Sequence, residues 1–138
     1  MRLRRNAKID LLRGVPLFAA CSTKELGLIA TAVDELAQPA GTVLTEEGAR
    51  GREFFVLIDG TVTVTKAGKP LSPLGPGDFF GEIALITDVP RTATVVAKTP
   101  VRLLVMTAPA FRRLVEETPS IQGKVLLALA RRVAPGTL

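Results

Sequence analysis

The stretch FFGEIALITDVPRTAT, residues Phe79–Thr94, brings a glycine, an acid and an arginine together around one short loop. Gly81 allows a tight backbone approach that a side chain would block. Residues 82–85 are expected to start a helical turn there, whose first N–H groups have no partner inside the helix. Those N–H groups and the positive end of the helix dipole attract anions. The stretch therefore predicts an anion site at the start of a short helix.

Two charged residues, Arg91 and Glu82, indicate which anion the site would bind. The guanidinium of Arg91 presents five N–H donors in a fork that fits phosphate oxygens. Glu82 would repel a phosphate, so an acid at this place favours another task, accepting hydrogen bonds from sugar hydroxyls. The stretch is interpreted as a pocket for a phosphate joined to a ribose. The alternative is a structural loop in which Arg91 pairs with Glu82 or Asp88.

Two blocks of this stretch resemble the phosphate-binding cassette of cyclic nucleotide-binding domains. GEIAL at residues 81–85 is followed by PRTATV at residues 90–95, and LGPGDFF at residues 74–80 leads in. We call residues 79–94 the cassette. The resemblance extends from about Leu11 to about Val133. Such domains occur in regulatory subunits of cAMP-dependent kinases, in cyclic-nucleotide-gated channels and in bacterial catabolite activator proteins.

The resemblance implies a role for each residue at the centre of the cassette. Glu82 would accept a hydrogen bond from the ribose 2′-hydroxyl, and Arg91 would pair with the cyclic phosphate. The backbone N–H groups of Ile83 and Ala84, which follow the turn at Gly81, would complete the phosphate cradle. The ligand implied is cAMP.

Further residues are expected around the base. Thr92 would touch phosphate or base, which leaves cGMP open as a second ligand. Val64 and Leu71 match family positions that pack on the base. Relatives often close the pocket with an aromatic residue or an arginine from the last helix, and this helix has no aromatic residue. Arg131 or Arg132 is therefore expected to stack over the purine; the alternative is a solvated, basic helix end.

Composition excludes several kinds of catalytic site. The 138 residues contain no histidine, which removes Ser-His-Asp triads, imidazole bases and nearly every catalytic zinc site. The single cysteine, Cys21, allows no internal disulfide. We therefore expect no enzyme and no metal. The net charge of +5 includes a basic N-terminal segment, which leaves contact with an acidic partner open.

Short alternating segments predict a mainly β fold. Thr61–Thr65 alternates between threonine and valine, and Asp59-Gly60 before it predicts a hairpin. A second strand pair is expected around Lys98-Thr99-Pro100. With the resemblance, this spacing predicts a β jelly roll (a double-stranded β-helix) of about eight strands with flanking helices. The strands are expected near residues 42–44, 54–58, 61–65, 71–74, 92–97 and 101–106.

Helices are expected at both ends of the jelly roll. Ile9–Arg13 predicts a short helix, and Ser22 with Glu25 forms a capping-box pattern that starts a helix running to about Leu36. Two further helices are expected, over residues 110–117 and 119–133. Chain length favours one domain. Its expected parts are an N-terminal helical part at 1–38, the jelly roll at 39–107 and C-terminal helices at 108–134.

The predicted function is a non-catalytic receptor module for a cyclic nucleotide. The resemblance implies that the last helix is a mobile lid that closes over the ligand. The rival is a static helix, or a homodimer through Leu126, Leu127 and Leu129. A second alternative is a ligand domain cut from a longer transcription regulator, channel or enzyme. No run reaches the length of a membrane span, and we expect a cytoplasmic protein that does not bind DNA through this chain alone.

Overall fold

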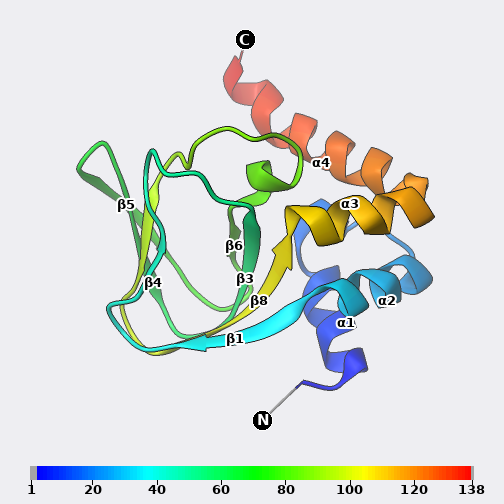
Figure 1. The fold of residues 1–138 in the computed structure, drawn as a ribbon, viewed down its shortest axis with the longest axis horizontal. Helices are drawn as coiled ribbons and strands as arrows, with labels where there is room; N and C mark the ends of the chain where they lie inside the picture. Colours follow the sequence, from blue (N-terminus) through cyan, green and yellow to red (C-terminus); the bar gives the residue numbers. More distant parts are fainter. Residues whose placement is uncertain (1–2, 138) are drawn as a thin grey trace. The chain divides into compact units, whose positions relative to one another are not determined.

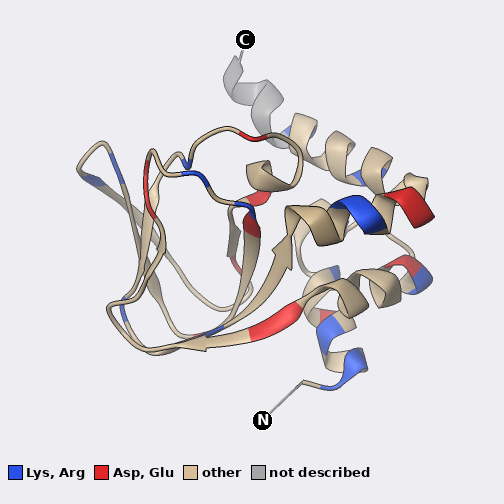
Figure 2. Ribbon diagram, in the orientation of Figure 1, with Lys and Arg blue, Asp and Glu red and all other residues tan. Residues whose placement is uncertain are grey.

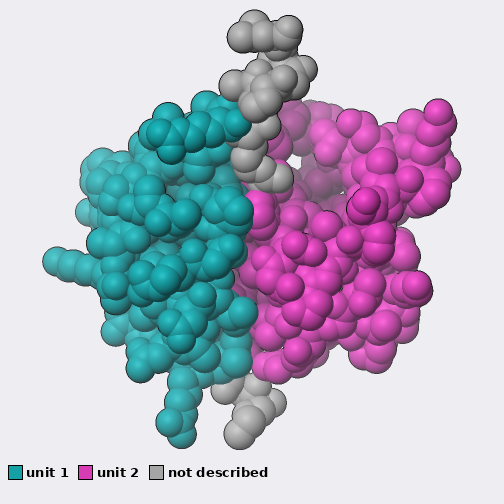
Figure 3. Space-filling view, turned by 180° about the vertical axis from the view of Figure 1, so that it is seen from behind, with its two compact units in different colours: residues 1–32, 109–138 teal, residues 33–108 magenta. Residues whose placement is uncertain are grey.

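The chain forms two compact units, which Figure 3 colours separately. The computed structural model describes residues 3–137, with side chains described for residues 3–131. A helical unit comes from residues 1–32 and 109–138, and a β unit comes from residues 33–108.

The helical unit contains four α-helices and one short 3₁₀ turn in the described residues (Figure 1). α1 carries the basic residues Arg5, Lys8 and Arg13, of which Arg5 and Arg13 are exposed (Figure 2). The last helix buries Ile121, Val125 and Leu129, which repeat every four residues and so share one face. Leu126 and Leu127 are exposed. The elements are α1 (Arg5–Arg13), η1 (Pro16–Phe18), α2 (Thr23–Ala32), α3 (Ala108–Glu117) and α4 (Pro119–Thr137).

The predicted capping box at the start of α2 is confirmed. The Glu25 N–H donates to Ser22 Oγ at 3.1 Å, and the Ser22 N–H donates to Glu25 Oε1 at 2.7 Å. Glu25 also accepts hydrogen bonds from Ser120 Oγ at 2.6 Å and from Lys124 Nζ, both on α4. One carboxylate thus caps α2 and holds the first turns of α4 to it.

The predicted C-terminal end of this helix is wrong. α2 ends at Ala32, and residues 34–38 form strand β1, which pairs with strand β8 from Asp34↔Val105 to Gln38↔Val101. Leu36 packs against the core of the β unit. The long-range pairing with β8 therefore ends the helix before Leu36.

The β unit contains eight strands in two antiparallel four-stranded sheets, as expected for a jelly roll. The strand order is β1-β8-β3-β6 in one sheet and β2-β7-β4-β5 in the other. Their bounds are β1 (Asp34–Gln38), β2 (Val43–Thr45), β3 (Glu53–Asp59), β4 (Val62–Lys66), β5 (Lys69–Leu74), β6 (Phe79–Phe80), β7 (Thr94–Ala97) and β8 (Val101–Thr107).

Two predicted strand pairs are wrong because the chain crosses between the sheets at both places. β3 and β4, which flank Asp59-Gly60, lie in different sheets, and so do β7 and β8. The two crossings are bonded to each other: the Lys98 N–H donates to the Thr61 carbonyl at 2.9 Å. Gly60 has φ +96°, and a Cβ there would lie 2.4 Å from the Pro100 carbonyl oxygen. The glycine thus permits a crossing between sheets here, not a hairpin.

The core of the β unit lies between the two sheets. Its buried members come from both of them, with Phe55, Leu57 and Leu103 from one and Val62 and Val95 from the other. The turn at Ala67-Gly68 joins β4 and β5 in a hairpin within one sheet. The second sheet therefore carries one exposed hairpin beside strands that are anchored in the core.

Candidate functional site

The cassette begins at a strand that is fixed in the core. Phe80 of β6 pairs with Phe55 of β3, and their rings stack with centroids 4.8 Å apart. Gly81 follows with φ +82°, in the left-handed region that favours glycine. The predicted helical turn is η2 (Glu82–Leu85), a 3₁₀ turn that buries Leu85. The turn is therefore held at both ends by apolar packing.

Arg91 lies at the other end of the cassette and is almost completely buried. Its side chain is 8% exposed, and Nη2 donates to the Glu53 carbonyl at 2.8 Å. The same nitrogen lies 3.5 Å from Glu53 Oε2. Burial lowers the pKa of Arg91 from its ordinary value, and the Glu53 carboxylate acts in the opposite direction. The protein thus keeps a guanidinium inside the site by giving it a partner on β3.

Two glycines make the space that this guanidinium occupies. A Cβ on Gly51 would lie 2.2 Å from Arg91 Nε, and a Cβ on Gly81 would lie 2.8 Å from Arg91 Nη1. The Gly81 Cβ would also lie 2.7 Å from the Glu53 carbonyl oxygen. Real Cβ atoms do not come this close, so both glycines are required by the position of Arg91.

The backbone of Arg91 is fixed by the loop between β2 and β3, residues 46–52. The Gly48 N–H donates to the Arg91 carbonyl, and the Arg91 N–H donates to the Ala49 carbonyl, both at 2.8 Å. Asp88, one of the two structural partners considered for Arg91, instead pairs with Arg50 at 2.8 Å. This loop therefore positions the arginine while its side chain turns toward β3.

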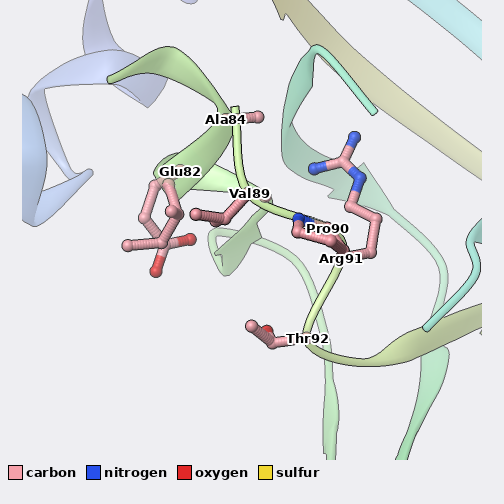
Figure 4. A pocket seen from close by; sticks show the side chains of 8 residues that line it. Glu82, Ala84, Val89, Pro90, Arg91 and Thr92 are labelled. Carbon is pink, nitrogen blue, oxygen red and sulfur yellow. The ribbon is translucent and has the colours of Figure 1, made fainter. Parts of the chain in front are cut away.

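A small cavity of about 70 Å³ lies within the cassette. A cavity needs roughly 10–15 Å³ of such volume to hold one water molecule, so this partly open space suits a group of a few atoms such as a phosphate. Figure 4 shows the Arg91 side chain extending to one side of the loop and the Glu82 side chain on the other side. The lining residues are Gly81, Glu82, Ile83, Ala84, Val89, Pro90, Arg91 and Thr92.

The structure thus brings all six of the sequence-predicted cassette residues to one cavity. Of the two N–H groups expected in the phosphate cradle, the Ala84 N–H donates to the Gly81 carbonyl at 3.1 Å. This bond closes the 3₁₀ turn. Ile83 and Thr92 are exposed at the cavity. The individual ligand contacts of these residues stay predictions.

The residues predicted around the base lie on two elements. Val64 and Leu71 are directly opposite each other on β4 and β5. Val64 packs against the core, whereas Leu71 is 50% exposed. Arg131 is exposed on α4, and the Arg132 side chain lies outside the described residues. Stacking of either arginine on a base stays a prediction.

Sequence reasoning missed the two residues that place Arg91. Glu53 starts a strand whose pattern predicts only burial, and its partner is 38 residues away. Gly51 follows Gly48 in a polar loop, where a glycine is ordinarily interpreted as a turn residue. The second glycine within four residues was the available signal for a close approach.

Two other classes of feature are absent from the described part of the chain. Residues 3–131 contain no cluster of His, Cys, Asp and Glu suited to a metal ion. Within the described helices, none combines the length and the apolar character needed to cross a bilayer.

Comparison with known proteins places this geometry in a family. The family model described as "Cyclic nucleotide-binding domain" matches residues 36–118. A cAMP-dependent protein kinase regulatory subunit from Pyricularia oryzae is 39% identical over 113 residues, covering 80% of this chain and 29% of that protein. A cyclic nucleotide-gated potassium channel from Rhizobium etli is 40% identical over 127 residues, covering 91% of this chain and 36% of that protein. The chain therefore spans about a third of the length of these relatives.

A solved structure shares the fold as well. The regulatory domain of Toxoplasma gondii PKA, in a co-crystal with cAMP, superposes with a TM-score of 0.81 at 25% identity. The match covers 96% of this chain and 50% of that one. The fold, the cassette geometry and the matching family model agree, and this chain belongs to the cyclic nucleotide-binding domain family.

Proposed function

We propose that this chain is a non-catalytic receptor domain that binds cAMP in the cassette, with cGMP as a second ligand. The observation that carries the proposal is the buried Arg91 guanidinium beside a small cavity that Glu82 and the η2 turn also line. A buried, fully charged fork is a strong phosphate anchor, because water competes little for its donors. The named relatives, a kinase regulatory subunit and a nucleotide-gated channel, support the same ligand class.

Each cassette residue has a defined part in the proposed complex. Arg91 pairs with the cyclic phosphate, and the N–H groups of Ile83 and Ala84 complete the cradle. The Ala84 N–H would then turn from the Gly81 carbonyl, to which it donates at 3.1 Å, toward a phosphate oxygen. Glu82 accepts a hydrogen bond from the ribose 2′-hydroxyl. Thr92 contacts the phosphate or the base.

The site residues give no support to catalysis. Hydrolysis of a phosphate ester needs a base, an activated nucleophile or a metal, and the chain has no histidine to supply the commonest base. The proposed output is a conformational change in α4. The kinase regulatory subunit and the nucleotide-gated channel named above support a regulatory output of this kind by analogy. Such a change requires that the ligand prefer one of two states of the helix.

The proposal also includes an effector that responds to the receptor domain. Residues 1–138 are taken as a single receptor domain whose effector, on another segment or another protein, responds to α4. Among residues 119–131 of α4, Leu126 and Leu127 are the large hydrophobic residues that are exposed, and they are the ones available for a protein partner or a homodimer. Leu129, which the sequence analysis included in a possible homodimer contact, is buried and is not available for one. A cytoplasmic location fits a receptor for an intracellular nucleotide.

Calorimetric titration with cAMP and with cGMP tests the proposal directly. Arg91→Ala should weaken cAMP binding by roughly thirtyfold to several thousandfold, since truncating one partner of a buried charge pair costs roughly 2–5 kcal/mol. Arg91→Lys keeps the positive charge and loses the forked donors, so its cAMP affinity should lie between that of the parent and that of Arg91→Ala. Parental affinity in a folded Arg91→Ala variant would overturn the assignment of the phosphate site.

A further inference from the structure

The loop of residues 46–52 is bonded to two segments that contact opposite ends of the proposed ligand. One segment is the arginine end of the cassette. The other is the β4–β5 hairpin, which carries Leu71. The loop is bonded to the cassette mostly through backbone groups, whereas it is bonded to the hairpin through a side chain. That side chain therefore connects the hairpin to the loop.

On the cassette side the loop is joined mostly through its backbone. The Gly48 N–H donates to the Arg91 carbonyl, and the Ala49 carbonyl accepts from the Arg91 N–H. The Glu47 N–H donates to Thr94 Oγ1 at 3.0 Å. A side-chain substitution at position 47 leaves all three of these bonds in place.

On the hairpin side the loop is joined through the side chain of Glu47. Its Oε1 accepts a hydrogen bond from the Ala67 N–H at 2.9 Å, across 20 residues of sequence. Ala67 is the first of the two turn residues between β4 and β5 and has φ +53°, a conformation that residues with a Cβ adopt rarely. A charged acceptor on its N–H favours this conformation and fixes the turn to the loop.

The hairpin offers an apolar surface on the strand after this turn. Directly opposite residues of an antiparallel pair share one face of the sheet, and Leu71 lies opposite Val64. Val64 packs against the core, so this face is the inner one. Leu71 nevertheless remains 50% exposed. An exposed leucine on an inner face is available to the flat, apolar face of a purine.

We propose that Glu47 is a positioning residue that holds the β4–β5 hairpin in place for contact with the base of the ligand. The inference rests on the proposed function and deepens it. The phosphate end is placed by the loop backbone, whereas the base end depends on the Glu47 carboxylate through Ala67. Loss of that carboxylate therefore removes base-dependent affinity and leaves phosphate-dependent affinity.

Two ligands separate these contributions. One is cAMP, and the other is a ribose 3′,5′-cyclic phosphate with a methoxy group in place of adenine, measured by competition against a fluorescent cAMP analogue. In Glu47→Ala we expect cAMP binding to weaken threefold to tenfold and the base-free ligand to stay within twofold of the parent. Glu47→Gln keeps an oxygen acceptor and should lie closer to the parent. Glu46→Ala, which removes the adjacent exposed acid, is the charge-matched control.

A second variant distinguishes the link from simple stabilisation of the turn. Ala67→Gly removes the Cβ that disfavours the turn conformation, but it does not restore the bond to the loop. We expect the base-dependent loss to persist when Ala67→Gly is added to Glu47→Ala. Amide hydrogen exchange at Ala67, which needs no ligand, should be faster in Glu47→Ala than in Glu46→Ala.

Several results would overturn the inference. They are an equal loss for both ligands, unchanged binding of both, or full restoration of cAMP binding by Ala67→Gly. Its failure is distinguishable from failure of the proposed function. If the parent binds cAMP and Glu47→Ala leaves the ratio of the two affinities unchanged, the receptor function stands and the role of Glu47 does not. If the folded parent binds neither ligand, both are wrong.

Discussion

The Arg91 guanidinium and the Glu53 backbone carbonyl are joined by a 2.8 Å hydrogen bond, with the Glu53 carboxylate 3.5 Å from the same nitrogen. The two parts of Glu53 act differently. The backbone carbonyl orients the Arg91 guanidinium, and it remains when the Glu53 side chain is substituted. The carboxylate, which is 43% exposed, places a negative charge beside a proposed phosphate site.

Glu53→Gln should therefore strengthen cAMP binding. Removing the carboxylate removes repulsion of the phosphate while the carbonyl still holds Arg91. Exposed charge pairs are worth about 0.2–1 kcal/mol, so a gain of at most about fivefold is expected at low salt, and it should shrink as salt rises. Titrations at two ionic strengths measure it. Weaker binding would mean that the carboxylate, and not the carbonyl, positions the guanidinium.

Gly51→Ala should weaken cAMP binding without unfolding the protein. The added Cβ would lie 2.2 Å from Arg91 Nε, so the arginine side chain must move. A misplaced phosphate donor should cost about tenfold or more, which corresponds to about 1.4 kcal/mol. Gly75→Ala is the matched control, since nothing lies within 4 Å of a Cβ there. Calorimetry with thermal melts compares the two, and equal affinities would contradict the steric role of Gly51.

Thr92→Ala should weaken cGMP binding more than cAMP binding. The Thr92 hydroxyl is exposed at the cavity and can bond the guanine amino group of a syn nucleotide. A neutral hydrogen bond is worth about 0.5–1.5 kcal/mol, so the difference should be about tenfold at most. Parallel titrations with the two nucleotides measure this ratio, and an equal loss for both would mean that Thr92 does not contact the base.

Glu25 should make the stability of the helical unit depend on acid pH. Hydrogen bonds from Lys124, Ser120 and Ser22 lower the Glu25 pKa from 4.5 to about 2. A depressed folded pKa contributes stability above the unfolded pKa, and this contribution is lost as pH falls from about 5 to about 2. Since one pKa unit corresponds to about 1.36 kcal/mol, the contribution is on the order of 1–3 kcal/mol.

Urea unfolding at pH 7 and at pH 3 measures this contribution in the parent and in Glu25→Gln. The variant should be less stable at pH 7 and should lose less stability on acidification than the parent does. Glu116→Gln, on the exposed side of α3, is the control. Parallel pH dependence in the parent and in Glu25→Gln would contradict the role given to this carboxylate.

Binding of cAMP should change the exchange protection of α4 in its second half. Ser120 and Lys124 are bonded to Glu25, so the first turns are tied to α2. A lid movement should therefore begin after Lys124 and not at Thr118-Pro119, the junction between α3 and α4. Hydrogen exchange over Ile121–Arg131, with and without cAMP, tests this. Increased protection in the cassette with an unchanged α4 would show binding without a moving lid.

The sequence by itself determined the features that depend on near neighbours. The left-handed turn at Gly81 and the short η2 turn follow from a glycine and the residues directly after it. The capping box of Ser22 and Glu25 is likewise confirmed, because its partners are three residues apart. The family was identified from the cassette residues, and the matching family model confirms it. Alternation also predicted the strand at residues 61–65, which is β4, since alternation needs only a buried and an exposed face.

Only the tertiary structure decided which distant groups meet. Asp59-Gly60 has the local form of a hairpin, but β3 and β4 belong to different sheets, since strand partners are chosen by long-range hydrogen bonds. The helix expected to reach Leu36 ends at Ala32 for the same reason, because β8 pairs with residues 34–38. Glu53 and Arg91 are 38 residues apart in the chain, and no local pattern records that a carbonyl on one strand will hold a guanidinium from another loop.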